Sequence, residues 1–228
     1  VVDCMSSRGV FASVDVHNNT GLNPHYACLN AIRTETLHLA AMFSRTVVYF
    51  TRPLGVQSIA MTKLCPAVTL ECGKVGQAYG VEHAVEYLGA CLHLAEHPQH
   101  PIARGDIDLF HTVAIVRVPE DVSFGFGCED RDLCLQDDLE HLNFRELPPG
   151  TSFGLAGSPM DIPFDVLNEE DVNVGGRYFE LDQAEIKTRT PVMPSMLTRD
   201  ETVIRQDCLC YLMERYDAHL TDAEQATD

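Results

Sequence analysis

The first hundred residues alternate short apolar runs with segments of helical spacing. Apolar and β-branched residues form strand-sized runs at Val10–Val16, Thr46–Phe50 and Ala67–Leu70. Apolar residues recur every three or four positions over Asn30–Phe43 and Ala78–Glu96, which predicts two helices. Strands that alternate with helices are typical of an α/β protein with a mainly parallel sheet.

The pattern changes beyond residues 97–104, a linker rich in Pro and His. Thr112–Val118 is predicted to be a strand, and single phenylalanines stand between turn signals such as Pro148–Gly150. Many short strands with frequent turns indicate a small β-rich domain. We therefore predict two domains, an α/β domain over residues 1–103 and a β-rich domain over residues 104–228.

The distribution of charge agrees with this boundary and narrows the choice of partners. The 228 residues include 34 acidic and 16 basic ones, which gives a net charge of -18 at pH 7. Residues 1–104 hold seven of each sign, so the whole excess of negative charge lies after residue 104. A surface this acidic repels phosphate backbones, and we therefore expect no nucleic-acid partner.

Cysteine usage and hydropathy predict the compartment. No apolar run approaches the roughly 18 residues of a membrane span, so we expect no membrane partner. The nine cysteines include no Cys-x-x-Cys pair, which favours reduced thiols in a cytoplasmic protein. The chain begins with Val and not Met, and we expect it to be an N-terminally truncated fragment. The sequence leaves open whether the chain forms a homo-oligomer.

Two polar clusters follow the predicted strands and carry the candidate chemistry. One runs from Asp15 to Thr20 and contains His17, and the other runs from Thr69 to Gly73 and contains Glu71. Ligand sites of open α/β sheets lie beyond the carboxyl ends of strands. A His there can bind a metal, and a Glu in a cleft can act as a general base. On these residues alone, a structural or solvated His is the commoner alternative.

The two clusters resemble the site motifs of a known enzyme family. Val14–Gly21 contains Asp-x-His-Asn-x-Thr, and Ala67–Gly73 contains Thr-x-Glu-x-Gly. Both are similar to motifs of the aspartoacylase and succinylglutamate desuccinylase family, a branch of the zinc carboxypeptidase superfamily. The family also has these motifs in the same order. As in the family, a long helix follows the second motif, and a β-rich part follows the helix. The resemblance implies a zinc-carboxypeptidase-like mainly parallel sheet, present in part, followed by a small β-rich domain.

The resemblance also implies an activity and the roles of two residues. His17 would be a zinc ligand, and Glu71 would be the base that takes a proton from metal-activated water. The substrate would be a small N-acyl amino acid or a short peptide cleaved at its C-terminus, through hydrolysis of an amide bond. Zinc would be the cofactor, and the chain would be a zinc-dependent amidohydrolase or metallocarboxypeptidase-like hydrolase.

Four further residues have a functional and a structural interpretation each. Asp15 either orients a metal ligand from two positions before it or caps the end of a strand. Asn18 and Asn19 either bind substrate or form a turn. Arg52 either binds a substrate carboxylate as a bidentate donor or is a surface residue.

One departure from the family supports a second hypothesis. The family takes its first two zinc ligands from a His-x-x-Glu motif that precedes the third ligand, which His17 resembles. Residues 1–16 of this chain contain no such motif. If nothing else supplies these ligands, the chain would be a non-catalytic acidic binding protein with a degenerate or truncated metal site. A His-x-x-Glu-His string at His93–His97 admits a third interpretation, as an inverted type of zinc peptidase motif.

Overall fold

The computed structural model describes residues 2–128, 130–158 and 161–216. Within them the chain divides into two compact units. Unit 1 comprises residues 2–19, 24–111 and 215–216, and unit 2 comprises residues 20–23 and 112–214. No helix among the described residues is long and apolar enough to cross a membrane.

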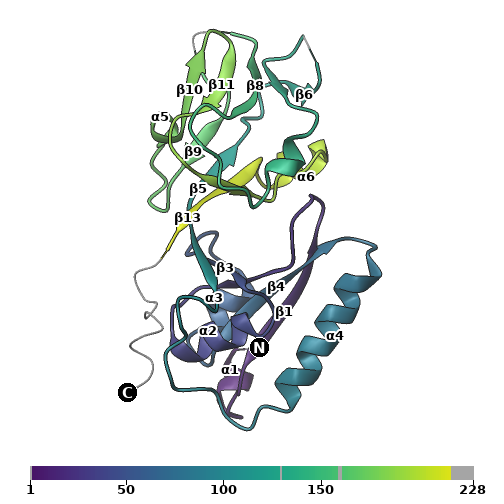
Figure 1. Cartoon of the computed structure of the whole chain (residues 1–228), viewed down its shortest axis with the longest axis vertical. Coiled ribbons are helices and arrows are strands. Elements are labelled where there is room, and N and C mark those ends of the chain that lie inside the picture. Colours follow the sequence, from purple (N-terminus) through teal and green to yellow (C-terminus); the bar gives the residue numbers. More distant parts are fainter. Residues whose placement is uncertain (1, 129, 159–160, 217–228) are drawn as a thin grey trace. The chain divides into compact units, whose positions relative to one another are not determined.

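Unit 1 is built on a mixed but mainly parallel sheet (Figure 1). The strand order is β1-β4-β2-β3-β5, where β5 contributes its first four residues. β1 pairs with β4, β2 with β3 and β3 with β5 in parallel, whereas β2 and β4 are antiparallel. The strands are β1 (Ser13–Asn19), β2 (Tyr26–Leu29), β3 (Thr46–Tyr49), β4 (Ala67–Lys74) and β5 (Asp108–Arg117).

Helices pack on both faces of this sheet, as expected for an α/β fold. α4 packs through Ala84 and Tyr87 against the face of β4 that carries Leu70. On the other face, Ser58 of α3 accepts a hydrogen bond from the Thr69 hydroxyl at 3.1 Å. The helices of unit 1 are α1 (Val2–Ser6), α2 (Thr34–Ala41), α3 (Gln57–Met61) and α4 (Ala78–Leu92).

The apolar side of α4 is largely exposed. Val81 and Val85 are exposed, and Leu92 keeps 86% of its surface accessible. The predicted helix also ends four residues early, at Leu92 instead of Glu96. The helical spacing therefore identified the helix correctly but did not identify the face that is buried.

One strand of unit 1 is shifted from its predicted place, one is longer than predicted, and one was missed. β1 begins at Ser13 instead of Val10 and extends to Asn19 through residues that the sequence suggests are a loop, and β4 extends to Lys74. Backbone pairing between His17 and Glu71 holds both extensions, whatever the polarity of the side chains. β2 was not predicted, because its four residues follow an Asn-Pro-His turn signal.

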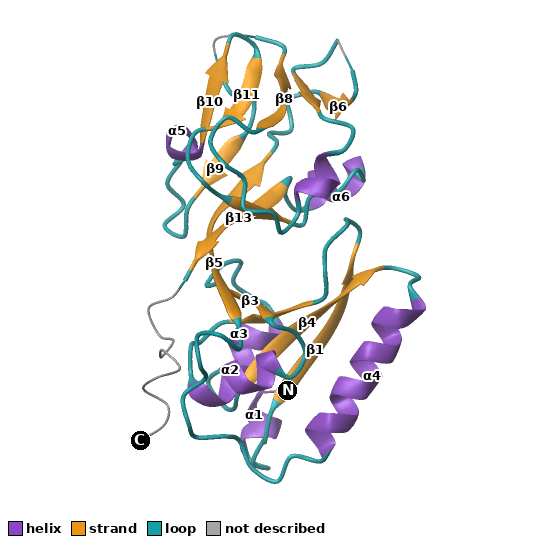
Figure 2. Cartoon of the chain, in the orientation of Figure 1, coloured by secondary structure: helices purple, strands orange, loops and turns teal. Residues whose placement is uncertain are grey.

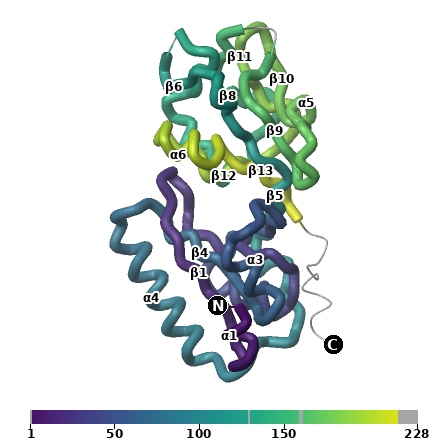
Figure 3. Tube along the Cα trace, turned by 180° about the vertical axis from the view of Figure 1, so that it is seen from behind, coloured from purple at the N-terminus to yellow at the C-terminus, as the bar shows by residue number. Residues whose placement is uncertain are grey.

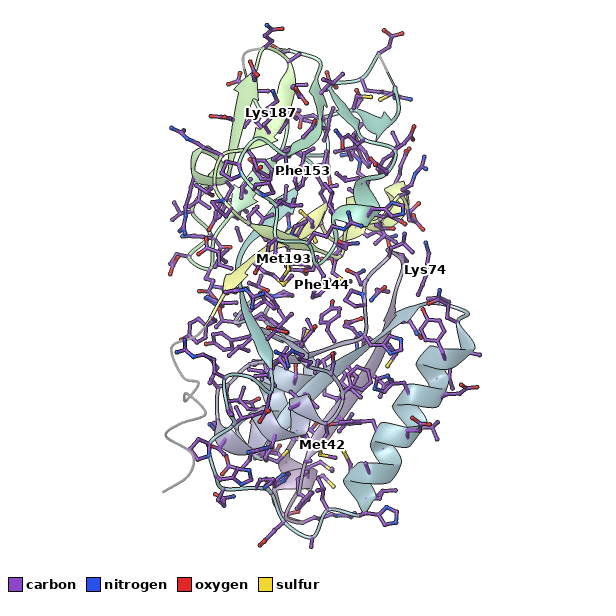
Figure 4. All side chains as sticks on the ribbon, viewed as in Figure 1. Met42, Lys74, Phe144, Phe153, Lys187 and Met193 are labelled. Atoms are coloured by element: carbon purple, nitrogen blue, oxygen red, sulfur yellow. The ribbon has the colours of Figure 1, made fainter. Side chains whose placement is uncertain are left out.

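Unit 2 is rich in short strands, and Figure 2 shows how few helices it contains. Its five-stranded sheet has the order β10-β11-β8-β7-β6. The buried core gathers Phe153, which is labelled in Figure 4, with Phe164, Phe179 and Tyr178. The later elements are β6 (Phe124–Phe126), β7 (Leu133–Leu135), a 3-10 turn (Leu139–Leu142), β8 (Ser152–Ala156), β9 (Asp165–Leu167), α5 (Gly175–Tyr178), β10 (Phe179–Asp182), β11 (Glu185–Thr188), β12 (Met193–Ser195), α6 (Glu201–Gln206) and β13 (Cys210–Arg215).

Candidate functional site

β1 and β4 place the two principal candidates next to each other. The strands pair in parallel, and His17 is the register partner of Glu71. Figure 3 shows the two strands from behind. Side chains at partnered positions of parallel strands point to the same face of the sheet. Both residues lie near the carboxyl ends of their strands, which is the usual place for a ligand site in an α/β fold.

Glu71 is a buried carboxylate with an altered proton affinity. Its exposed fraction is 8%, and its Oε2 atom accepts a hydrogen bond from the Asn19 side-chain amide at 3.4 Å. Burial raises the pKa of Glu71 from 4.5 to about 7, because a carboxylate loses hydration there. The neighbouring His17 and the hydrogen bond from Asn19 act in the opposite direction on this pKa. The result is a group that exchanges a proton near neutral pH.

His17 is half-exposed and is held by Asp15. The His17 Nε2 atom lies 3.1 Å from Oδ2 of Asp15, and 51% of the imidazole surface is accessible. A carboxylate only accepts hydrogen bonds, so Nε2 carries the proton in the neutral ring and Nδ1 keeps a free lone pair. This carboxylate–imidazole arrangement is typical of histidines that bind a metal through their other nitrogen.

The donor atoms present do not complete a metal site. Catalytic zinc usually takes three protein ligands. The described part of the chain contains no group of three or more His, Cys, Asp or Glu side chains that could hold a metal ion. His17 and Asp15 alone therefore do not fit a resident catalytic zinc.

The two asparagines after His17 differ sharply in their surroundings. Asn19 is buried. Its side-chain nitrogen donates to Glu71, and its Oδ1 atom has no hydrogen-bond partner. Asn18 is exposed, and its amide donates to the Gly73 carbonyl at 3.5 Å. Asn19 therefore orients Glu71 and keeps one acceptor unused beside it, whereas Asn18 ties the ends of β1 and β4 together.

Arg52 is not brought to this cluster by the strand register. It follows the carboxyl end of β3, which runs antiparallel to β4. Tyr49, at the end of β3, aligns through Leu29 with Val68, near the start of β4. Glu71 lies toward the other end of β4, so a role for Arg52 in binding substrate stays a prediction.

The histidines of the His93–His97 string do not converge. α4 ends at Leu92, before the string begins, so the two rings do not share a helical face. A ring nitrogen of His93 contacts the Gly89 carbonyl at 2.7 Å, and one of His97 contacts the Phe11 carbonyl at 2.8 Å. The structure therefore gives no support to the inverted zinc-peptidase interpretation.

A histidine pair on the α4 side of the sheet was not predicted. The Nδ1 atoms of His25 and His83 lie 2.9 Å apart, and His83 Nε2 lies 2.9 Å from the Phe43 carbonyl. His83 therefore donates from Nε2 and accepts at Nδ1, which leaves His25 Nε2 as a buried acceptor without a partner. Burial lowers the pKa of His25. A contact between residues 58 apart leaves no signal in the sequence.

Two grooves of unit 1 lie away from His17 and Glu71. One, of about 590 Å³, is lined by residues including Arg33, Lys63 and His97. The other, of about 490 Å³, lies between α1, β1 and α3. Neither groove is lined by His17 or Glu71.

Comparison with known proteins identifies the fold. No family model matches the chain, and no curated protein matches its sequence. Succinylglutamate desuccinylase from Chromobacterium violaceum superposes with a TM-score of 0.51 at 16% identity, over 90% of this chain and 54% of that one. Succinylglutamate desuccinylase/aspartoacylase from Rhodobacter sphaeroides gives 0.51 at 16% identity, over 90% and 58%.

A third structure, of succinylglutamate desuccinylase from Vibrio parahaemolyticus, gives a TM-score of 0.50 at 14% identity, over 92% of this chain and 56% of that one. The chain thus spans just over half the length of these similar structures. At these identities the similarity establishes the fold, and the fold that the sequence resemblance implies is confirmed.

Proposed function

We propose that this chain is part of a hydrolase of the aspartoacylase and succinylglutamate desuccinylase type, with Glu71 as its general base. The substrate is an N-acyl amino acid or a peptide C-terminus, and the bond cleaved is an amide. One observation carries the proposal: a buried carboxylate with a pKa of about 7 lies beside an imidazole on one face of the sheet. The shared fold supports the choice of reaction.

Glu71 would act on water and then on the leaving nitrogen. In its ionised form it takes a proton from the attacking water while the oxygen bonds to the amide carbon. It then gives that proton to the nitrogen as the carbon–nitrogen bond breaks. A pKa of about 7 serves both steps, because the group accepts and releases a proton near the working pH. Asn19 would hold the carboxylate in place during both transfers.

Within the proposal, zinc dependence rests on His17. His17 presents its Nδ1 lone pair and would be one ligand, with Asp15 orienting the ring. The described residues do not supply a three-ligand set, so the zinc prediction depends on a measurement of metal content in the purified full-length protein. The substrate roles of Asn18, Asn19 and Arg52 are likewise predictions.

A non-catalytic binding protein is the second candidate. The incomplete donor set among the described residues favours it. The excess of 18 negative charges would then attract cationic partners to an acidic surface. This alternative gives the raised pKa of Glu71 no role.

Amide hydrolysis distinguishes the two candidates. The full-length protein is assayed with N-succinylglutamate, other N-acyl amino acids and a short peptide, as wild type and as Glu71→Gln. Glu82→Gln, an exposed change on α4, is the matched control. Loss of a general base lowers kcat by about 10²- to 10⁴-fold, whereas the control keeps full activity. Equal turnover by Glu71→Gln and wild type removes Glu71 from the mechanism, and no turnover by wild type favours the binding protein.

A further inference from the structure

Two cysteines in unit 2 lie with their sulfur atoms in contact. Cys134 belongs to β7, and Cys128 comes two residues after the end of β6. The two Sγ atoms are 2.6 Å apart. Six positions separate the residues, so no helical or strand periodicity brings them together.

The backbone holds both cysteines in this arrangement. Cys134 is paired with Gly125 on one side and with Leu155 on the other, which fixes it inside the sheet. The Cys128 backbone N–H donates to the Cys134 sulfur at 2.8 Å, and the Cys134 thiol contacts the Cys128 carbonyl. The contact between the thiols is therefore a property of the fold and not of a chance rotamer.

A glycine turn directs Cys128 back toward the sheet. Gly127 has a φ of +59°, and its N–H donates to the Leu135 carbonyl at 3.1 Å. A Cβ atom on Gly127 would lie 2.5 Å from a carboxylate oxygen of Asp137, so no larger residue fits without a shift of that side chain. The left-handed backbone at Gly127 also favours glycine. The turn thus fixes the direction in which the chain enters Cys128.

We propose that Cys128 and Cys134 form a reversible intramolecular disulfide when the protein meets a hydroperoxide. A disulfide bond is about 2.05 Å long, so it forms here with a movement of about half an ångström. This pair is a redox modification site in unit 2, separate from the candidate hydrolase residues of unit 1.

The chemistry proceeds in two balanced steps. The Cys128 thiolate attacks a peroxide oxygen, the O–O bond breaks, and the products are a Cys128 sulfenic acid and water once the leaving oxygen takes a proton. The Cys134 sulfur then attacks the Cys128 sulfur, loses its proton and displaces hydroxide, which leaves as water. Two thiols and one hydrogen peroxide give one disulfide and two waters. A dithiol reductant reverses the change.

The surroundings of the two thiols assign the order of these steps. Cys128 is partly exposed and meets the oxidant, whereas Cys134 is buried. Burial raises the pKa of Cys134 to about 11; the side-chain contact with Cys128 adds to this shift, and the backbone hydrogen bond from Cys128 opposes it. The buried thiol therefore resists direct oxidation and reacts with the sulfenic acid that forms beside it.

Trypsin provides a direct readout, because Arg131 lies between the two cysteines. Cleavage separates a peptide of residues 118–131, which carries Cys128, from one of residues 132–145, which carries Cys134. The full chain is treated with hydrogen peroxide, alkylated, digested without reduction and analysed by mass spectrometry. We expect the two peptides to appear joined, two hydrogens lighter than their sum, with a matching loss of the alkylated single peptides. Dithiothreitol should restore both.

Two variants give the proposal matched controls. Cys128→Ser should abolish the joined pair, and Cys4→Ser, which removes an exposed cysteine, should leave it unchanged. Circular dichroism checks that each variant is folded. The proposal is overturned if peroxide leaves both peptides separately alkylated, converts Cys128 to sulfinic acid without a joined pair, or links it to a cysteine other than Cys134.

Discussion

Glu71 makes stability depend on pH in a direction that is unusual for a carboxylate. In the folded chain its pKa is about 7, above the 4.5 of the unfolded chain. Between these values the folded state binds the proton that the unfolded state has lost, so the free energy of unfolding falls as pH rises. The contribution of Glu71 to the free energy of unfolding is therefore fully present below pH 4.5. It is lost as the pH rises through 7, the pKa in the folded state.

The size of the effect follows from the two pKa values. A difference of about 2.5 units corresponds to about 3 kcal/mol above pH 7. Glu71→Gln removes this term and keeps the shape of the side chain, and the new amide oxygen still accepts the bond from Asn19. We therefore expect Glu71→Gln to be more stable than wild type by about 3 kcal/mol at pH 8, and by less than about 1 kcal/mol at pH 5.

Thermal unfolding followed by circular dichroism measures this difference. For a chain of this length, about 3 kcal/mol corresponds to a rise in Tm of roughly 6–12 °C at pH 8. Glu82→Gln, at an exposed position of α4, is the control and should leave Tm unchanged at both pH values. The reasoning is refuted if Glu71→Gln has the same Tm as wild type at pH 8, or if its gain is equal at pH 5 and pH 8.

Two further predictions follow from the same unit. Asn19→Ala removes a hydrogen bond that lowers the pKa of Glu71, so the rise of kcat/KM with pH should move to higher pH. A pH profile of amide hydrolysis measures this shift, and Asn18→Ala should not cause it, since its amide binds the Gly73 carbonyl. On α4, Leu92→Gln should change the free energy of unfolding by less than about 0.5 kcal/mol, as is usual for exposed positions. Tyr87→Ala, at a buried position, should lower the free energy of unfolding measured in urea by about 3 kcal/mol or more. Equal effects of Leu92→Gln and Tyr87→Ala would contradict the difference in burial between the two side chains.

The sequence predicted that β1 and β4 are strands, but it did not predict where they begin and end. The runs at residues 10–16 and 67–70 are apolar enough to indicate strands, and their polar continuations carry the candidate chemistry. The strands continue through those polar residues because one backbone pairs with the other, a contact that hydropathy does not report. Tyr26 begins the buried strand β2, which the turn signal before it does not indicate.

Other features depend on contacts between distant positions and could not be predicted. Helical spacing located α4, but burial depends on which elements pack against it, and Leu92 is exposed as a result. The cysteines at 128 and 134 match no metal-binding spacing, and their contact arises from the turn at Gly127. The division of function between residues 1–103 and 104–228 stays a prediction.

The energetic penalty at Glu71 bears on the choice between the two functions. An acidic binding surface needs exposed carboxylates, and a buried carboxylate adds nothing to such a surface. An amide at this position would keep the hydrogen bond from Asn19 and avoid a cost of about 3 kcal/mol at neutral pH. Groups that lower stability in this way are characteristic of sites where a proton must be exchanged. The carboxylate beside His17 therefore favours the hydrolase over the binding protein, even though the described residues leave the metal site incomplete.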